Sequence, residues 1–410
     1  MKIAVIGARG LPPPSHEGAR LEGEDVRKKV PFQGAATSGI EHYCAELYPR
    51  VVAAGHTVDL FARSSYVNRS WYRQGLDRGI RVIPMPCLNQ RGVDALISSC
   101  LGAISSILHR YDIVHFHALG PALFSFLPRL ASSSKIVVSC HGLDWQRVKW
   151  GKFSSRLIRL GEETAVRYAH EIIVVSQPLQ DYFWKTYGRQ TVYIPNAPAT
   201  YEASDPSFRF GSALGLRPKR YMIYLGRLVP EKAPDLLIQA FQKLQPPGWT
   251  LVFIGRSSDT SSFTANLLTL ASNNPNIVFT GELSGGRLAE IVRGAGLYVS
   301  ASELEGLPLS MLEAMQEGIP MLVSDIPPHQ QLVGGDRGVL FQTGDLDALV
   351  HQMNWAISNP QDMAERAYRA QEFIRLGYQW EAIVRDTVKL YQFLRSEPKS
   401  SHSGVSPYRA

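Results

Sequence analysis

The sequence predicts an α/β fold of two doubly wound domains, each with a parallel sheet covered by helices on both faces. Residues 2–7 and 220–226 each form a short apolar segment that ends in glycine, as the first strand of such a domain does. Each segment is followed by a loop and then by an amphipathic helical pattern, at residues 39–54 and 233–244. Short β-branched runs then alternate with helical patterns, which is the order of elements in a parallel sheet.

The remaining elements follow from the same two periodicities. In the first half, Gly55 ends the first helix, and the helical pattern at 93–108 is partly apolar. The further strands that we expect lie at residues 56–62, 113–117, 135–139, 171–176, 191–194, 250–255, 276–280, 297–300 and 320–324. A last amphipathic helix is expected at residues 380–395.

Composition shifts divide the chain. The segment 196–218 is rich in Pro, Ser and Ala with weak periodicity, so we place the domains at residues 1–200 and 201–379. The tail, residues 396–410, is polar and is expected to be disordered. Between the first strand and the first helix, residues 11–34 form a long loop with three consecutive prolines, and loops of that length are usually functional or disordered.

Composition restricts the class of protein. The 410 residues are 45% hydrophobic and 19% charged, as in ordinary globular proteins. No signal-peptide pattern opens the sequence, and no apolar run reaches the ~18 to 20 residues of a membrane span. The four cysteines have no zinc spacing and fit a reducing compartment, so we expect a cytoplasmic protein. The net charge of +7 favours anionic partners without choosing among them.

The segment 302–315 carries the strongest chemical signal. Glu305 and Glu313 stand eight positions apart, with Gly306, Leu307 and Pro308 between them. Pro308 fits the first helical position, which would put Glu305 in the loop at a strand's carboxyl end and Glu313 in the helix. Bare amides at the helix start would bind an anion, and the two acids could accept bonds from sugar and ribose hydroxyls. Alternatively, Glu305 caps its own helix and Glu313 is a solvated surface acid.

A second segment follows the first strand of the second half. Gly226 is followed by two cations, Arg227 and Lys232. Positioned cations there could stabilise the charge that develops on a leaving diphosphate. The alternative is a pair of surface cations bound to Glu231 and Asp235.

Two segments of the first half are candidates. Gly39, after Ser38, opens the first helix and permits close approach of a ligand to the backbone, although Ser38 could simply be the helix cap with Glu41 as its partner. His141 follows a strand and could bond a sugar hydroxyl, or could be a core histidine satisfied by the backbone. The pair His115 and His117 lacks a third ligand with supporting spacing, so no metal is expected there.

A basic amphipathic stripe runs through residues 147–160. The cations Lys149, Lys152, Arg156 and Arg159 are spaced as on one helix face, beside Trp150, Phe153, Leu157 and Leu160. Such a helix can lie on an anionic membrane surface. Equally, its apolar stripe could pack on the domain core.

At these residues the chain resembles glycosyltransferase family 4, retaining enzymes of the GT-B fold, in which two Rossmann-like domains face each other across a cleft. The resemblance implies that Arg227 and Lys232 after Gly226 hold the donor diphosphate. It implies that Glu305 and nearby amides hold the sugar, that Glu313 holds the ribose, and that His141 and Gly39 lie near the donor. The final helix resembles the one that returns to the N-terminal domain. Residues 141–150 are similar to a rhamnosyltransferase-like subgroup.

The expected activity is therefore metal-independent transfer of a sugar, with retained configuration, from a nucleotide sugar to a glycan or lipid-linked acceptor in polysaccharide biosynthesis. No cofactor is expected, and contact with the inner membrane face stays open. One alternative is a nucleotide-sugar epimerase or hydrolase of the same fold. Another is a non-catalytic basic binding protein, although Glu305 and Glu313 would repel the phosphates of a nucleic acid.

Overall fold

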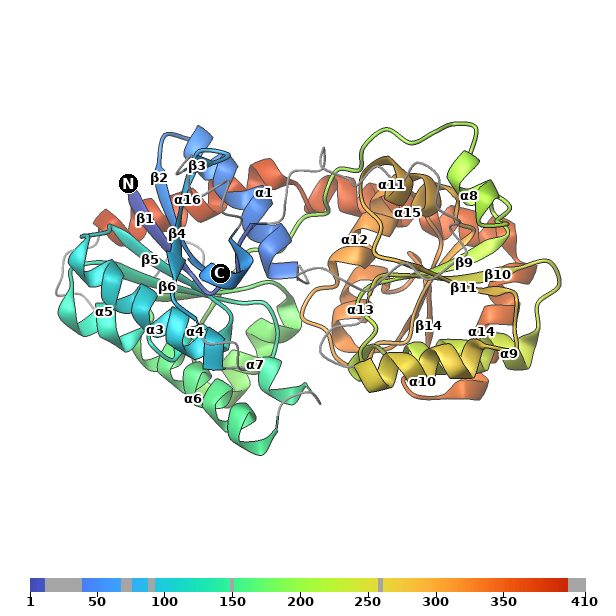
Figure 1. Cartoon of the computed structure of the whole chain (residues 1–410), viewed down its shortest axis with the longest axis horizontal. Helices are drawn as coiled ribbons and strands as arrows, with labels where there is room; N and C mark the ends of the chain where they lie inside the picture. The colour runs from blue at the N-terminus through green and yellow to red at the C-terminus, as the bar shows by residue number, and fades with distance from the viewer. Residues whose placement is uncertain (12–38, 68–75, 88–92, 148–150, 257–260, 397–410) are drawn as a thin grey trace. The chain divides into compact units, whose positions relative to one another are not determined.

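The computed structural model describes residues 1–11, 39–67, 76–87, 93–147, 151–256 and 261–396 (Figure 1). Contacts divide the chain into two compact units. The N-terminal unit ends at Asn196 and takes in the chain again from Trp380, and the C-terminal unit contains Ala197–Gln379. Apart from Leu11, the long loop at 11–34 lies outside the described residues, as do Ser38 and the tail from residue 397.

The N-terminal unit contains an eight-stranded sheet in the order β3-β4-β2-β1-β5-β6-β7-β8. Every neighbouring pair is parallel except β3 and β4, which are antiparallel. Its strands are β1 Lys2–Ile6, β2 Thr57–Arg63, β3 Leu76–Asp77, β4 Ile80–Met85, β5 Ile113–His117, β6 Lys135–Cys140, β7 Glu171–Val174 and β8 Val192–Tyr193. Strands β3 and β4 were not predicted. The first is only two residues long, and the second carries a proline and stays half-exposed along most of its length.

The helices of this unit pack in two groups. Helices α3 to α6 contact one another, while α1 packs against α16, so the last helix of the chain belongs to the first unit. Their bounds are α1 Gly39–Ala53, η2 Ser64–Tyr66, α3 Val93–Leu108, α4 Leu119–Ala122, α5 Phe126–Ala131, η3 Asp144–Gln146, α6 Lys152–Tyr168, α7 Gln177–Tyr187 and α16 Trp380–Ser396.

The C-terminal unit contains a six-stranded, fully parallel sheet in the order β11-β10-β9-β12-β13-β14. Its strands are β9 Tyr221–Leu225, β10 Thr250–Ile254, β11 Ile277–Gly281, β12 Leu297–Ser300, β13 Met321–Ser324 and β14 Val339–Phe341. The strand β14 was not predicted, since three residues are too few to show a period.

Helices cover both faces of this sheet. Figure 1 shows α9, α10 and α14 along one face, where their apolar side chains join the strands in one buried cluster, and α11, α12 and α15 on the other. The helices are α8 Arg209–Ala213, η4 Pro230–Lys232, α9 Pro234–Leu244, α10 Ser261–Ala271, α11 Gly285–Gly294, α12 Leu309–Gln316, α13 Pro327–Val333, α14 Leu346–Ser358 and α15 Pro360–Gly377.

Strand order reverses at one point in each sheet, beside β1 and β5 in the first and beside β9 and β12 in the second. Doubly wound sheets bind ligands at the carboxyl ends of the strands at this point. Close backbone approach there requires glycine. A Cβ on Gly7 would lie 2.2 Å from the carbonyl oxygen of His117, and one on Gly255 would lie 2.0 Å from that of Gly226.

Candidate functional site

The loop after β9 brings one predicted cation over the end of the strand. Gly226 has φ +155°, and a Cβ there would lie 3.2 Å from the Nζ of Lys232 and 3.5 Å from its Cδ. The side chain of Lys232 therefore runs across Gly226, back toward the carboxyl end of β9. The turn η4 makes this possible, because it reverses the chain at Pro230–Lys232 before α9 begins.

The structure joins Lys232 to the predicted acid of the neighbouring loop. Lys232 Nζ lies 2.8 Å from Glu305 Oε1, and the two side chains are only 16% and 14% exposed. Ser302 Oγ donates a second hydrogen bond to the same oxygen at 3.1 Å. The backbone also connects the loops, since the amide of Glu303 donates to the carbonyl of Glu231 at 2.9 Å. Lys232 thus pairs with Glu305, and the alternative pairing with Glu231 or Asp235 is wrong for this lysine.

The start of α12 differs by one position from the prediction. Pro308 is the residue before the helix, with ψ 104°, and not its first helical residue. Its carbonyl accepts hydrogen bonds from the amides of Met311 at 3.1 Å and Leu312 at 3.2 Å. Among the described residues, nothing accepts a hydrogen bond from the amides of Gly306, Leu307 or Leu309. Those N–H groups beside the Lys232–Glu305 pair suit a bound anion.

Glu313 lies on α12 and is held from outside the helix. The hydroxyl of Tyr201 donates to Glu313 Oε2 at 3.0 Å. Burial of Tyr201, together with the charge of Glu313, raises the pKa of this tyrosine well above its ordinary value, so it remains a hydrogen-bond donor. Glu313 is therefore a partly buried, hydrogen-bonded acid, and the alternative of a solvated surface acid is wrong.

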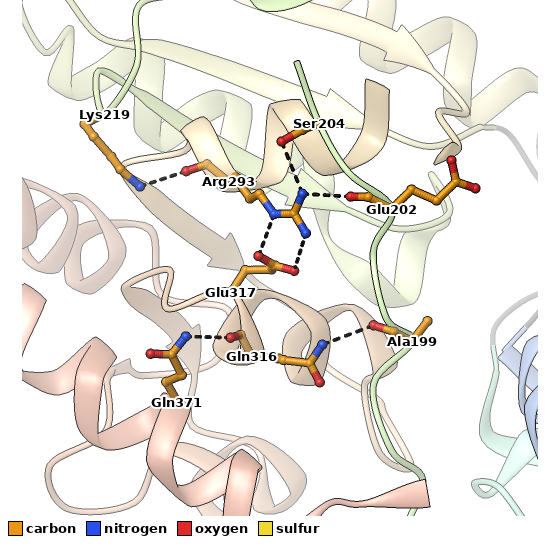
Figure 2. A network of polar contacts seen from close by, with 8 residues as sticks. All are labelled: Ala199, Glu202, Ser204, Lys219, Arg293, Gln316, Glu317 and Gln371. Carbon is orange, nitrogen blue, oxygen red and sulfur yellow. Dashed lines mark hydrogen bonds and ion pairs between the residues drawn. The ribbon is translucent and has the colours of Figure 1, made fainter. Parts of the chain in front are cut away.

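Tyr201 belongs to a segment that is fixed to the C-terminal unit along its length. Figure 2 shows Arg293, near the end of α11, donating to the carbonyl of Glu202 at 2.7 Å and to Ser204 Oγ at 3.1 Å. The same guanidinium forms a two-pronged pair with Glu317, with contacts of 2.9 and 3.3 Å. Gln316 donates to the carbonyl of Ala199 at 3.4 Å. These contacts place Tyr201 beside the helix that carries Glu313.

In the N-terminal unit, His141 directly follows β6 and is partly exposed. Its Nε2 lies 3.0 Å from Nδ1 of His117, and His117 Nε2 lies 2.6 Å from the hydroxyl of Tyr48. Burial lowers the pKa of His141 to about 4, against the opposing charges of Asp144 and Glu41, so its ring is neutral at pH 7. The alternative of a histidine satisfied by the backbone is wrong, because the partner is another side chain.

The pair His115 and His117 bonds to protein groups. His115 Nε2 lies 2.8 Å from Ser139 Oγ, and its Nδ1 lies 2.6 Å from the hydroxyl of Tyr391 on α16. Burial lowers the pKa of His115 to about 3. Within the described part of the chain, no group of three or more His, Cys, Asp or Glu side chains is arranged to hold a metal ion.

The first residue of α1 is Gly39, which is exposed. Two residues later, Glu41 is 4% exposed and accepts a hydrogen bond from the amide of Arg9 at 3.0 Å. Glu41 thus joins the first helix to the loop after β1. The proposed cap, Ser38, lies outside the described residues.

Arg256 was not selected from the sequence, although a signal was available. Ile254, Gly255 and Arg256 repeat, after β10, the form of Leu225-Gly226-Arg227 after β9. The carbonyl of Arg256 accepts from the amide of Leu228 at 3.0 Å, and its side chain, 13% exposed, lies 3.0 Å from Glu282. A further cation therefore lies at the carboxyl end of the neighbouring strand.

The basic stripe begins α6, and part of its apolar side is exposed. Phe153 is 74% and Leu160 is 48% exposed, while Ile158 is buried. Lys152, Arg156 and Arg159 are exposed beside them, and Lys149 and Trp150 lie outside the described residues. The alternative in which the whole apolar stripe packs on the core is therefore wrong for Phe153 and Leu160. In the described part of the chain, no helix combines the length and the hydropathy needed to cross a membrane.

Comparison with known proteins concerns both units. Residues 37–198 match the family model described as Glycosyltransferase Family 4, and residues 212–373 match the one described as Glycosyl transferases group 1. The chain is 25% identical over 375 residues to a GDP-mannose-dependent alpha-(1-6)-phosphatidylinositol monomannoside mannosyltransferase of Mycolicibacterium smegmatis, with 85% of this chain and 92% of the relative covered. It is 24% identical over 321 residues to a GDP-mannose:cellobiosyl-diphosphopolyprenol alpha-mannosyltransferase of Xanthomonas campestris, covering 74% and 79%.

Among solved structures, HepE of Anabaena in complex with UDP-glucose is similar, with a TM-score of 0.74 and 18% identity over 96% of this chain and 100% of that one. At this identity the likeness concerns the fold. It confirms the predicted fold class, GT-B, with two Rossmann-like domains.

Proposed function

Since the chain is a glycosyltransferase of the family 4 type, we propose that it transfers a hexosyl group, with retained configuration, from a nucleoside-diphosphate sugar to a glycan or lipid-linked acceptor. The observation that carries the proposal is the Lys232–Glu305 pair, which lies at the point of strand reversal beside amides that have no acceptor among the described residues. A cation, an acid and bare N–H groups are the three kinds of group that a diphosphate sugar needs.

The site would stabilise the negative charge that develops on the departing diphosphate. An ammonium group has three N–H donors, so Lys232 can bond Glu305 and still donate to phosphate oxygens. Arg227, half-buried in the same loop, supplies a second cation. Charge that develops as the sugar–oxygen bond breaks is then stabilised by fixed groups. We accordingly propose that the reaction needs no metal ion and no cofactor.

The two acids would accept hydrogen bonds from hydroxyl groups of the donor. Glu305 and the amides of Gly306 and Leu307 would bind the sugar, and Glu313 the ribose. The leaving diphosphate would deprotonate the acceptor hydroxyl on the face that it leaves, which retains the anomeric configuration without a covalent enzyme intermediate. We assign His141 and Gly39 to positions near the donor sugar and phosphates.

The acceptor and the pathway are narrower proposals. The names of the two similar mannosyltransferases include a phosphatidylinositol monomannoside and a diphosphopolyprenol, so a lipid-linked acceptor in cell-surface polysaccharide synthesis fits. The similarity of residues 141–150 to a rhamnosyltransferase-like subgroup suggests a rhamnosyl donor. The exposed Phe153 and Leu160, together with the cations of α6, suit contact with an anionic membrane surface.

Donor screening tests the proposal most directly. The purified chain would be heated with a panel of nucleoside-diphosphate sugars, and stabilising sugars would then be incubated with lipid-linked acceptors, with EDTA in a parallel reaction. We expect one donor to raise the melting temperature, and a product whose mass gains one hexosyl residue with retained configuration by NMR, unaffected by EDTA. Equal donor consumption with and without acceptor would favour a hydrolase or epimerase. Binding to anionic vesicles, measured by co-sedimentation, tests the surface contact separately.

A further inference from the structure

A buried chain of aromatic and imidazole groups leads to His141 from the core of the N-terminal unit. Tyr48 and His117 are 0% exposed, and each lies within hydrogen-bond distance of the next group toward His141. The rings of His117 and His141 differ by only 23° in plane, which suits an in-plane hydrogen bond between their nitrogens. Among the described residues, the other nitrogen of His141, Nδ1, has no partner.

A neutral imidazole has one N–H and one bare nitrogen, so the chain has two possible proton arrangements. In the first, Tyr48 donates to His117 Nε2, and His117 Nδ1–H donates to His141 Nε2, which leaves the proton of His141 on Nδ1. In the second, every bond runs the other way, and Nδ1 of His141 is bare. Both arrangements satisfy the buried groups, so distances must choose between them.

The distances favour the first arrangement. The contact between Tyr48 and His117 Nε2 is 2.6 Å, which lies inside the range of an O–H donor and below the 2.7 to 3.2 Å typical of an N–H donor. Tyr48 is 3.0 Å from Nδ1 of His115, and that nitrogen already has Tyr391 at 2.6 Å. Tyr48 also has a hydrogen bond with the hydroxyl of Tyr391, which is the other group that could accept its proton. Because the contact with His117 is the shorter of the two that the Tyr48 hydroxyl makes with ring nitrogens, we assign its proton to that bond.

We propose that Tyr48 and His117 fix His141 as its Nδ1–H tautomer, so that His141 offers a hydrogen-bond donor, and not a base, at the carboxyl edge of the N-terminal sheet. His117 and Tyr48 are positioning residues, because they act through His141. The ligand class rests on the proposed function: an oxygen of the bound sugar, which a fixed N–H can bond without a proton changing hands.

Nitrogen NMR on the wild-type chain tests the tautomer without any substrate. The full-length protein would be labelled with ¹⁵N in histidine, and the His141 signals assigned by their loss in His141→Asn. At pH 7 we expect Nδ1 to carry the proton and Nε2 to be bare, with a preference of about five-fold, the value of one net hydrogen bond. A proton on Nε2, or equal amounts of both tautomers, would overturn the proposal.

Variants then separate the relay from ordinary packing. Tyr48→Phe removes only the hydroxyl, and we expect His141 to become a near-equal mixture with kcat about two-fold lower and KM unchanged. Tyr111→Phe is the matched control, since it removes another buried hydroxyl of this unit, one that donates to Asp59. The single variant His117→Asn keeps an N–H near the position of Nδ1, so in this variant His141 should retain the Nδ1–H tautomer and the enzyme should retain its kcat. An unchanged tautomer in Tyr48→Phe would also refute the relay.

The two hypotheses fail in different ways. If NMR shows the Nδ1–H tautomer and no nucleoside-diphosphate sugar is turned over, the relay stands and the proposed function fails. If transfer is observed and the His141 proton lies on Nε2, the function stands and the relay fails.

Discussion

The charge of Lys232 is the most informative group to remove. Lys232→Met keeps a long apolar stem over Gly226 while it removes the ammonium group. We expect turnover of the nucleoside-diphosphate sugar to fall about 10²- to 10³-fold, the usual effect of losing one preorganised charge-stabilising donor. The stem of the side chain, and hence the packing of the loop, stays.

The loss of stability in Lys232→Met depends on how exposed the Lys232–Glu305 pair is. With side chains 16% and 14% exposed, the Lys232–Glu305 pair is more shielded than a surface pair and less buried than a core pair. Surface pairs contribute about 0 to 1 kcal/mol, and breaking a buried pair costs about 3 to 5 kcal/mol. Because Ser302 still donates to Glu305, we expect a loss of about 1 to 2 kcal/mol, or roughly 2 to 8 °C in melting temperature.

The assay combines initial rates at saturating donor with thermal unfolding of the same samples. Lys243→Met is the matched control, because Lys243 pairs with Asp347 in the same unit while their side chains are 53% and 80% exposed. This control should unfold within about 2 °C of wild type and keep its turnover. If Lys232→Met retained turnover within three-fold of wild type while remaining folded, our assignment of the diphosphate site would be wrong.

Three further outcomes follow from the geometry. Gly255→Ala, at φ +138° and with its Cβ 2.0 Å from a carbonyl oxygen, should lose about 1 to 3 kcal/mol of unfolding free energy in urea, and a loss below 0.5 kcal/mol would contradict the close approach. Arg293→Ala and Glu317→Ala should show a coupling of about 1 kcal/mol in a double-mutant cycle, because they share a two-pronged bond, whereas purely additive losses would count against the network of Figure 2. The pKa values of His115 and His141 are lowered to about 3 and about 4, so these two residues bind fewer protons in the folded than in the unfolded chain. The free energy of unfolding should therefore fall as the pH drops below about 6.5, by up to about 1.4 kcal/mol per pH unit for each group. A free energy of unfolding that stays constant between pH 7 and 5 would refute this.

The sequence by itself determined the elements and the local parts of the site. Short apolar segments that end in glycine, such as the one before Gly226, predict buried strands followed by turns, because a strand covered on both faces is continuously apolar. Glu305 and Glu313 could be placed in a loop and a helix because the proline between them restricts the backbone locally. The short edge strands β3 and β14 were not predicted, and neither was β4, which contains a proline and is mostly half-exposed, because such strands have little periodicity of buried residues.

Only the tertiary structure decided the partners. Tyr201 reaches Glu313 across 112 positions, and Tyr391 reaches His115 across 276. Hydrophobic periodicity reports which face of an element is buried, but not which element covers it, because that depends on strand order and on where the chain crosses the sheet. The ion pair of Lys232 with Glu305, and the tautomer that the buried tyrosine imposes on His141, therefore exist only once the strands lie side by side.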